Sequence, residues 1–332
     1  MISKSMSCKE PFLLQPAYKD YLWGGTRLIE KYGINAPTPL AEAWECSTHQ
    51  DGYSIIASGR FKGSTLADVL REQPQLLGTR YAHLGALPIL IKLIDAKKDL
   101  SVQVHPGDNY AVTHEQGERG KTEMWYVLEA DSNASLVYGF NHDMSLERLQ
   151  QSLQQGTVER YLQRLPVRAN DVYFIPAGLV HALGAGVVVA EIQESSDLTY
   201  RLYDYNRTDK NGQKRQLHVA KALAVANRQK SSRPRQPVRI LRYAPGSARE
   251  LLCCCQYFVV ERLLVNTALG ASTAGIVVSL ESFLVLLCVD GGGELLFDGG
   301  ALTFAKGSCI FVPAGMQDLR LRGKMMLLSV HC

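Results

Sequence analysis

Long hydrophobic runs are missing from this sequence of 332 residues. The longest apolar stretch, which includes Leu284 to Val289, is far shorter than the roughly 20 residues of a membrane-crossing helix and fits a buried strand instead. The N-terminal segment from Met1 to Ser7 has no apolar core, which argues against a signal peptide. We therefore expect a cytoplasmic protein that does not enter a membrane.

A strong excess of charge of either sign is also missing. The 36 basic and 32 acidic residues leave a formal net charge of +4, and the basic side chains are dispersed except between Arg228 and Arg239. Such a balance does not favour nucleic acid as a partner. With 46% hydrophobic residues, the composition is that of a globular protein with room for two domains.

The spacing of the cysteines excludes two common uses of this residue. The eight cysteines include three in a row, from Cys253 to Cys255, and no Cys-x-x-Cys pair occurs. Consecutive cysteines do not build an ordinary disulfide framework, so we expect reduced thiols that pack as small apolar residues. Metal binding by the triplet is a less favoured alternative.

What the chain does contain is a series of short apolar runs bounded by glycine, proline and aspartate, which predicts a mainly β fold. Helical spacing of apolar residues is confined to a few short segments. Strands are expected at 53–57, 87–94, 124–128, 135–138, 172–175, 187–192, 258–265, 283–289, 294–297, 309–312 and 325–330. Helices are expected at 65–70, 145–153, 157–165 and 218–226.

Two histidines, a carboxylate and an amide occupy positions that predict one shared site. Alternation in the segment 102–105 places Gln103 and His105 on the same face of a strand. Glu123 opens another apolar run, and His181 follows a Pro-Ala-Gly turn. Imidazole and oxygen ligands of this kind suit a divalent metal, and we expect one ion about 2.0–2.2 Å from the four ligand atoms.

The turn that precedes His181 occurs a second time. The segment 311–318 repeats the local pattern of 174–181, with Asp318 at the position of the histidine and no histidine-bearing strand before it. We therefore expect two β-barrels, of which only the first holds a metal. The expected domains are a catalytic domain over 1–230 with helical segments near 143–165 and 216–228, a linker over 231–239, and a metal-free domain over 240–332.

The sequence resembles the type I mannose-6-phosphate isomerases (phosphomannose isomerases) of the cupin superfamily, in their short bacterial form. The matching segments are Tyr21–Gly25, Ala41–Glu45, Leu100–Pro106, Gly120–Tyr126, Ile175–Ala182 and Glu191–Tyr205, and they run in order through the chain.

The resemblance implies two cupin-type jelly-roll barrels with a short helical insertion. It also implies one Zn²⁺ per chain, the interconversion of mannose 6-phosphate and fructose 6-phosphate, and an essential role for Arg201. Gly120 stands where many long-form members carry a histidine, which shifts the expected acid–base role to Lys121. The implied zinc ligands are Gln103, His105, Glu123 and His181.

The chemistry of such an isomerase explains these residue types. A proton moves between C1 and C2 through an enediolate, so the catalyst must stabilise negative charge and supply a base. One carboxylate and three neutral ligands leave zinc a net charge of about +1, which suits a Lewis acid. Lys121 shares a strand face with Glu123 and is expected to act as a proton shuttle or oxyanion partner. Arg201 suits enediolate or phosphate oxygens, and Ser101 and Arg207 are expected to contact the 6-phosphate.

Two other functions use the same residues. A non-catalytic sugar-binding double cupin would explain the barrels and a metal but would leave Lys121 and Arg201 without a purpose. A non-haem iron oxygenase also uses two histidines and one carboxylate, but Gln103 would fill a position that such enzymes keep open. We therefore expect a monomeric isomerase that acts on a small sugar phosphate.

Overall fold

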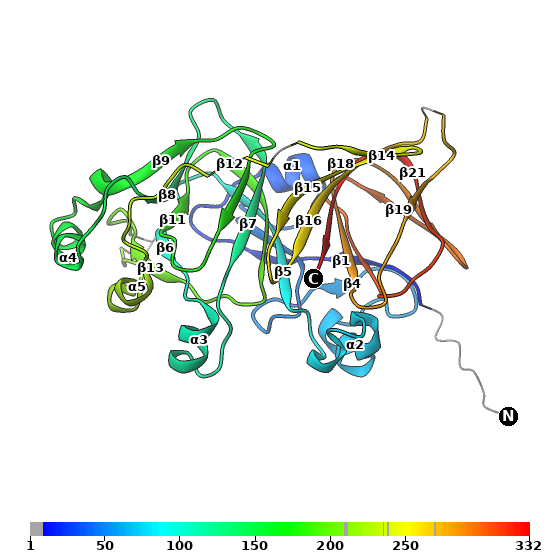
Figure 1. Cartoon of the computed structure of the whole chain (residues 1–332), viewed down its shortest axis with the longest axis horizontal. Coiled ribbons are helices and arrows are strands. Elements are labelled where there is room, and N and C mark those ends of the chain that lie inside the picture. The colour runs from blue at the N-terminus through cyan, green and yellow to red at the C-terminus, as the bar shows by residue number, and fades with distance from the viewer. Residues whose placement is uncertain (1–8, 209–211, 235, 238, 269) are drawn as a thin grey trace. The chain divides into compact units, whose positions relative to one another are not determined.

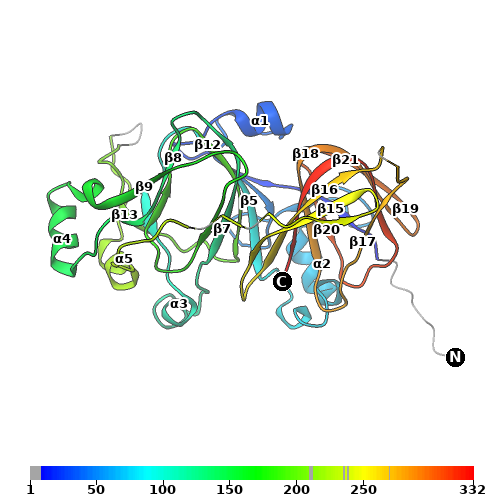
Figure 2. The same ribbon diagram turned by 45° about the horizontal axis from the view of Figure 1, so that its top comes forward.

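The structure is a computed structural model that describes residues 9–208, 212–234, 236–237, 239–268 and 270–332 (Figure 1). The N-terminal segment considered above as a signal peptide lies outside these residues. No helix within the described ranges is long and apolar enough to cross a membrane. Strands dominate the described chain, as the short apolar runs predict (Figures 1 and 2).

The chain forms two compact units, and neither is continuous in sequence. Unit 1 takes its residues from Met1–Ala17, Trp44–Pro88 and Pro237–Cys332, and unit 2 from Tyr18–Ala43 and Ile89–Gln236. This division differs from the expected consecutive domains 1–230 and 240–332. The physical reason is strand pairing, because an N-terminal strand completes the sheet that the C-terminal residues build.

Unit 1 contains a ten-stranded sheet, whose main path runs β14-β15-β16-β21-β18-β20-β1-β4, with β17 beside β21 and β19 beside β18. Alternate apolar side chains on its strands, such as Leu286, Ile310 and Leu327, form the core of the unit. The strands are β1 (Phe12–Gln15), β4 (Ile55–Ile56), β14 (Arg242–Ala244), β15 (Ser247–Cys254), β16 (Val259–Asn266), β17 (Ala274–Ile276), β18 (Leu284–Phe297), β19 (Gly300–Ala305), β20 (Cys309–Val312) and β21 (Leu319–His331).

Strand β18 corrects one expectation from the sequence, which predicted separate strands at 283–289 and 294–297. The glycines between them do not end the strand, since Gly293 stays paired with both β19 and β21. A side chain at Gly293 would lie 2.1 Å from the carbonyl oxygen of Arg322. Glycine therefore permits the close approach of two strands here rather than a turn.

Unit 2 contains two smaller sheets, with the strand orders β10-β7-β12-β5-β3-β2 and β13-β6-β11-β8-β9. Ile94 and Trp125 of the first sheet pack with Leu136 and Leu183 of the second in one buried cluster. The two sheets therefore face each other across a shared core. Their strands are β2 (Ala17–Lys19), β3 (Glu42–Cys46), β5 (Ile89–Ala96), β6 (Val102–Val104), β7 (Glu123–Ala130), β8 (Ser135–Phe140), β9 (Leu162–Pro166), β10 (Val172–Ile175), β11 (His181–Leu183), β12 (Val187–Glu194) and β13 (Tyr200–Tyr203).

Helices are short, and their caps explain which of them the sequence predicts. The hydroxyl of Thr65 accepts a hydrogen bond from the backbone of Asp68, and that of Ser145 accepts one from Arg148, so the expected helices begin where the caps place them. The expected helix at 218–226 is also confirmed. The α-helices are α1 (Arg27–Tyr32), α2 (Leu66–Glu72), α3 (Asp108–His114), α4 (Leu146–Gln154) and α5 (Val219–Val225), and the 3₁₀ helices are η1 (Pro74–Leu77), η2 (Ala82–Leu84) and η3 (Val158–Tyr161).

The expected helix at 157–165 is wrong beyond its first turn. Residues Val158–Tyr161 form η3, but Leu162–Pro166 form β9, which pairs with β8. Leu162 and Leu165 are three residues apart, which is the spacing of one helical face. Both are nevertheless part of strand β9, and both side chains are buried there. Pairing with the edge of a sheet therefore overrides the local pattern.

One carboxyl group on β3 is buried without a hydrogen-bond partner among the described residues. The side chain of Glu45 on β3 is 1% exposed, and neither of its oxygens has a partner among the described residues. Burial raises the pKa of this carboxyl well above its usual range. The folded protein therefore holds Glu45 in its neutral form over a pH range in which the unfolded chain ionises it.

We predict that the Glu45→Met variant has a larger free energy of unfolding than the parent protein, by about 1–3 kcal/mol near neutral pH. A raised folded pKa removes stability as the pH climbs from about 4.3 toward that pKa, because only the unfolded chain releases the proton. The advantage of the variant should therefore grow as the pH rises above about 4.3, and chemical denaturation at a series of pH values measures it. Glu45→Gln is the matched control, which abolishes the titration and keeps a buried polar group. An advantage that does not change with pH would contradict the assignment.

Candidate metal centre and active site

Three of the four expected metal ligands converge in unit 2. His105, Glu123 and His181 place one ligand atom each within 4.8 Å of the others, and all three side chains are buried. His105 follows β6 directly, Glu123 opens β7 and His181 opens β11. The carboxylate thus comes from one sheet and the two imidazoles from the sheet that faces it.

Gln103, the fourth expected ligand, lies on the same strand face as His105. Strand β6 places Gln103 between two neighbours, opposite His181 on β11 and opposite Arg201 on β13. Gln103 also lines the cavity described below. One strand therefore joins the candidate ligands to the candidate catalytic arginine.

The hydrogen bonds of the two imidazoles leave one nitrogen of each ring available as a ligand. Nδ1 of His105 lies 2.8 Å from the carbonyl oxygen of Leu198, and Nδ1 of His181 lies 2.8 Å from that of Leu179. A carbonyl oxygen only accepts, so the proton of each neutral ring resides on Nδ1. Nε2 of His105 lies 3.2 Å from Oε1 of Glu123, and Nε2 of His181 lies 3.6 Å from Oε2.

The ionisation states match those that a divalent cation requires. Burial lowers the pKa of His105, and the neighbouring Lys121 lowers it further. Burial and the neighbouring His105 lower the pKa of His181 to about 3. Burial alone would raise the pKa of Glu123, but the charge of Lys121 holds it well below its usual range. The site therefore offers two neutral imidazoles and one carboxylate anion.

The ligand atoms are also poorly satisfied by the protein itself. Both carboxylate oxygens of Glu123 and Nε2 of His181 have no aligned hydrogen bond within the described part of the chain. Nζ of Lys121 lies 2.6 Å from Oε1 of Glu123 as an ion pair. Buried polar atoms left in this state are costly, and a cation among them would satisfy all three atoms. The donor set therefore fits a divalent metal such as zinc.

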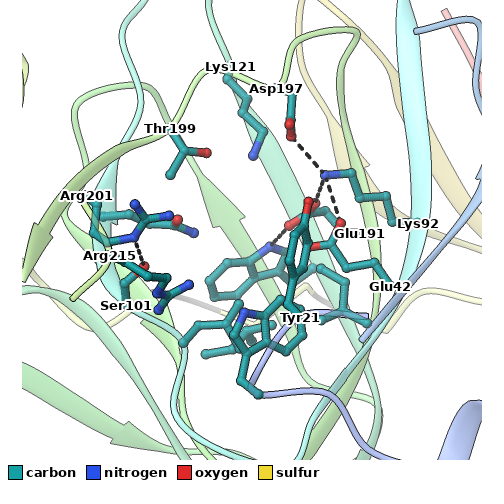
Figure 3. A pocket seen from close by; sticks show the side chains of 16 residues that line it. Tyr21, Glu42, Lys92, Ser101, Lys121, Glu191, Asp197, Thr199, Arg201 and Arg215 are labelled. Carbon is teal, nitrogen blue, oxygen red and sulfur yellow. Dashed lines mark hydrogen bonds and ion pairs between the residues drawn. The ribbon is translucent and has the colours of Figure 1, made fainter. Parts of the chain in front are cut away.

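A cavity of about 280 Å³ opens beside these ligands (Figure 3). Lys121 lines this cavity, and its Nζ also lies 3.5 Å from Nε2 of His105. Figure 3 shows Arg201 and Arg215 on one side of the cavity and Lys92 with its partners on the other. The lining residues are Tyr21, Trp23, Glu42, Lys92, Ile94, Leu100, Ser101, Gln103, Lys121, Trp125, Leu183, Glu191, Asp197, Thr199, Arg201 and Arg215.

The first side of the cavity carries two half-buried guanidinium groups. Nε of Arg201 donates to Oγ of Ser101 at 3.2 Å, and a terminal nitrogen donates to the carbonyl oxygen of Gln216 at 2.7 Å. Arg215 donates to both carboxylate oxygens of Asp204, at 2.8 and 2.5 Å. Burial and the nearby cation of Arg215 lower the pKa of Arg201. An anion bound here would relieve the repulsion between the two cations.

Arg207, which the sequence analysis assigned to the phosphate, is not among the residues that line this cavity. Its guanidinium donates to the carbonyl oxygen of Asp99 and to the carboxylate of Asp204. Arg215 lies on the cavity instead, and sequence reasoning missed it because no motif surrounds it. The sequence signal that could have indicated it was Asp204. A carboxylate within a largely aromatic segment is expected to be partly buried and paired with basic side chains.

The second side of the cavity carries a buried lysine among three carboxylates. Nζ of Lys92 lies 3.6 Å from one oxygen of each of them, which belong to Glu42, Glu191 and Asp197 (Figure 3). Burial alone would lower the pKa of Lys92, but these carboxylates raise it above its usual range. Sequence reasoning assigned these four residues no role. The sequence contains one indication of this cluster. Lys92 interrupts the otherwise apolar run 89–94, and Glu191 interrupts the run 187–192.

Glu191 has an ionisation state unlike that of an exposed carboxylate. Burial and the nearby charge of Glu123 raise its pKa to about 7. Nε1 of Trp125 donates a hydrogen bond to its Oε2 at 2.8 Å, while Oε1 faces Lys92. A carboxyl group that is half ionised near neutral pH and lines a polar cavity is suited to proton transfer.

Comparisons of the sequence with known proteins all identify one family of isomerases. The phosphomannose isomerase type I catalytic domain matches residues 12–132, and the mannose-6-phosphate isomerase cupin domain matches residues 249–332. The mannose-6-phosphate isomerase ManA of Bacillus subtilis is 34% identical, over 97% of this chain and 99% of the relative. A mannose-6-phosphate isomerase of Streptococcus mutans is 32% identical, over 97% and 98%.

Solved structures give the same result. The crystal structure of the mannose 6-phosphate isomerase from Bacillus subtilis has a TM-score of 0.89 and 34% sequence identity, over 98% of this chain and all of that one. A mannose 6-phosphate isomerase bound with zinc and yttrium shares the fold at a TM-score of 0.72 and 18% identity, over 97% and 99%. These matches confirm the predicted mainly β, cupin-type fold.

We predict that this protein binds one divalent ion and that Glu123→Gln lowers its affinity for zinc by at least about 100-fold, because the variant keeps the shape of the side chain but removes the charge. Metal analysis of the purified protein measures the stoichiometry. Thermal unfolding with and without a chelator measures the coupled stability, which should fall on metal removal. His142→Ala is the matched control, since this exposed histidine should leave both readings unchanged. Full zinc content in Glu123→Gln would contradict the site.

Proposed function

The chain belongs to the type I phosphomannose isomerases, and on that premise we propose that its cavity holds a sugar phosphate between the metal ligands, the paired arginines and the Lys92 cluster. The protein is a metal-dependent aldose–ketose isomerase that interconverts mannose 6-phosphate and fructose 6-phosphate through an enediolate. The main support for the roles proposed below is the position of Lys121, which contacts both Glu123 and His105 and also lines this cavity.

The proposed metal is zinc, one ion per chain, held by Gln103, His105, Glu123 and His181. Support comes from the neutral imidazoles, the unsatisfied carboxylate oxygens and the position of the Gln103 amide on the cavity. When bound, such an ion supplies positive charge that polarises the sugar oxygens. Three neutral ligands and one carboxylate would leave that charge only partly neutralised.

Proton transfer is assigned to groups of the chain itself. Lys121 is an ammonium donor for the oxygen that becomes negative in the enediolate. Glu191, with a pKa of about 7, is suited to accept the proton from one carbon and return it to the other. Trp125 fixes one oxygen of Glu191 and Lys92 faces the second, so this carboxyl has a defined orientation.

The 6-phosphate is assigned to the side of the cavity with the two arginines. Arg201, Arg215 and Ser101 offer two planar cations and a hydroxyl, a set that matches phosphate oxygens. The lowered pKa of Arg201 supports this role, because a phosphate dianion would stabilise the crowded cations. Arg207 would then act through Asp204, which holds Arg215 in place.

Three further expectations remain proposals. The seven cysteines in the described part of the chain are all free thiols, which fits a cytoplasmic protein. A monomeric state is proposed from the sequence alone. The absence of a metal from residues 240–332 is proposed because Asp318 stands after the second turn, where His181 stands after the first.

A coupled assay on purified, zinc-loaded protein tests the assigned chemistry. We predict turnover of mannose 6-phosphate that is lost after chelation and restored by zinc, since the ion stabilises the charge that develops on the sugar oxygens. Glu191→Gln should lower kcat by about 10²-fold or more, because the amide cannot accept the proton. Intact binding of metal and sugar phosphate without any turnover would favour the non-catalytic sugar-binding double cupin.

We predict that Arg201→Ala retains its zinc and its fold but loses catalytic efficiency strongly. A cation removed from developing negative charge typically costs about 10²–10³ in rate, or about 3–4 kcal/mol. Arg201→Lys should rescue poorly, because a point charge on a flexible stem does not reproduce the planar fork. Steady-state kinetics and metal analysis of the variants give the measurement, and parental turnover in Arg201→Ala would remove this residue from the mechanism.

The division of the loss between kcat and KM separates two roles for Arg201. If the guanidinium holds the phosphate, the loss falls largely on KM, and mannose without a phosphate is affected little. If it faces the enediolate, kcat falls with both substrates. Arg215→Ala and Arg207→Ala form a matched pair, since both contact Asp204 but only Arg215 lines the cavity.

A further inference from the structure

The segment 119–122 carries Lys121 to the edge of the cavity, although it has no regular secondary structure. Two carboxyl groups contact its backbone, that of Asp108 at the start of α3 and that of Glu194 at the end of β12. Neither has a role in the function proposed above. We propose that Glu194, in contact with Asp108, is a positioning residue that fixes the place from which Lys121 reaches into the cavity. This inference rests on the role proposed for Lys121 and goes one step beyond it.

The two carboxyl groups accept hydrogen bonds from the residues on either side of Lys121. The backbone N–H of Gly120 donates to Oδ1 of Asp108 at 2.9 Å. The backbone N–H of Thr122 donates to Oε1 of Glu194 at 2.8 Å, and the backbone N–H of Glu194 donates in return to the carbonyl oxygen of Thr122 at 3.1 Å. A further hydrogen bond joins the two carboxyl groups to each other. Asp108 and Glu194 therefore form a bridge across the backbone of Lys121.

The backbone around this bridge is closely packed. The N–H of Lys121 donates to the carbonyl oxygen of Pro106 at 3.0 Å, and Pro106 directly follows the candidate ligand His105. A side chain at Gly120 would lie 2.5 Å from the backbone nitrogen of Asp108, so glycine permits the segment to approach the start of α3. The bridge thus ties the lysine to the same stretch of chain that presents a metal ligand.

The backbone position of Lys121 decides where its ammonium group lies. The side chain is buried, and Figure 3 shows it directed into the cavity. Its Nζ lies 2.6 Å from Oε1 of Glu123 and 3.5 Å from Nε2 of His105. A buried stem has few rotamers with which to correct a displaced backbone. A misplacement of about 1 Å in a reacting group can cost about 10²-fold in rate, so a carboxyl group outside the cavity can affect the chemical step.

The contact between the two carboxyl groups requires a proton. Two ionised carboxylates only accept hydrogen bonds, and they repel each other. Burial and the nearby carboxyl of Asp108 raise the pKa of Glu194 to about 7, which agrees with one proton shared between the two groups. A glutamine side chain has the same length, an acceptor oxygen and a permanent N–H donor, so Glu194→Gln should keep both contacts. Glu194→Ala removes them.

A buried carboxyl group with a purely structural role would affect the free energy of unfolding and leave the chemical step unchanged. Asp95 offers the matched control for such a role. Asp95 and Glu194 are both 2% exposed, and Oδ2 of Asp95 accepts a backbone N–H, that of Arg27, at 2.8 Å. Asp95 is not among the residues that line the cavity. Asp95→Ala should therefore lower stability while kcat stays within about threefold of the parent value.

Steady-state kinetics on the zinc-loaded variants test the inference. Glu194→Ala should retain its zinc and lower kcat by about 10-fold to 10²-fold, with KM changed less than about threefold, because the displaced lysine acts in the chemical step. Glu194→Gln should keep kcat within about threefold of the parent value, because its amide keeps the bridge. Asp108→Ala opens the same bridge from its more exposed end and should also lower kcat, which keeps the inference testable if Glu194→Ala does not fold.

Amide hydrogen exchange gives a readout that needs no turnover. In the metal-free protein, a peptide that spans residues 119–122 should exchange faster in Glu194→Ala than in the parent, because two backbone hydrogen bonds lose their anchor. The rate in Glu194→Gln should match that of the parent. Equal exchange in all three proteins would overturn the bridge.

Lys121→Met separates this inference from the proposed function. If Lys121 acts as proposed, Lys121→Met lowers kcat by about 10²–10³-fold, and adding Glu194→Ala lowers it by less than about threefold more, because Glu194 acts through the lysine. Parental turnover in Lys121→Met would overturn the role of the lysine and this inference with it. With that role confirmed, the inference alone is overturned in any of three cases: Glu194→Ala keeps the parental kcat, Glu194→Gln loses as much as Glu194→Ala, or the losses in the double variant add in full.

Discussion

The buried carboxylate of Glu123 is the constraint on which the rest of unit 2 depends. An anion with no exposed surface is stable only where positive or donor groups surround it, and an uncompensated one costs several kcal/mol as an approximate figure. Lys121 supplies one compensating charge at 2.6 Å. The imidazoles of His105 and His181 turn unprotonated nitrogens toward the same carboxylate, so they add no compensation of their own and leave room for a cation between the three groups. Electrostatic compensation of one group thus fixes where a cation can bind.

The same constraint organises the cavity beside it. The charge of Glu123 helps to raise the pKa of Glu191, and Glu191 in turn faces Lys92. The ligands therefore border a cavity that has the Lys92 cluster on one side and the two arginines on the other. A substrate with a carbonyl at one end and a phosphate at the other matches this order, with its polar reacting end toward the ligands and its dianion toward Arg201 and Arg215.

Local patterns in the sequence predicted the parts of the site that local geometry controls. Alternation placed Gln103 and His105 on one strand face, and a turn preceded His181. The structure brings His105 and His181 together with Glu123, and Gln103 stays a predicted ligand. Thr65 and Ser145 marked their helices because capping acts over three residues. The Lys92 cluster joins residues that are distant in the sequence, and β9 depends on pairing with β8, so no short window of sequence contained them.

The interleaving of the two units has a consequence for the order of synthesis. Strand β1 pairs with β20, so residues Phe12 to Leu14 have partners at Cys309 to Phe311, almost at the other end of the chain. Unit 2 is complete once Gln236 has emerged from the ribosome, whereas the sheet of unit 1 waits for its last strands. At about 5–20 residues per second, the nascent β1 spends roughly 15–60 s without its β20 partner. During that interval an unpaired apolar strand is open to pairing with other chains, which makes it a natural client for chaperones.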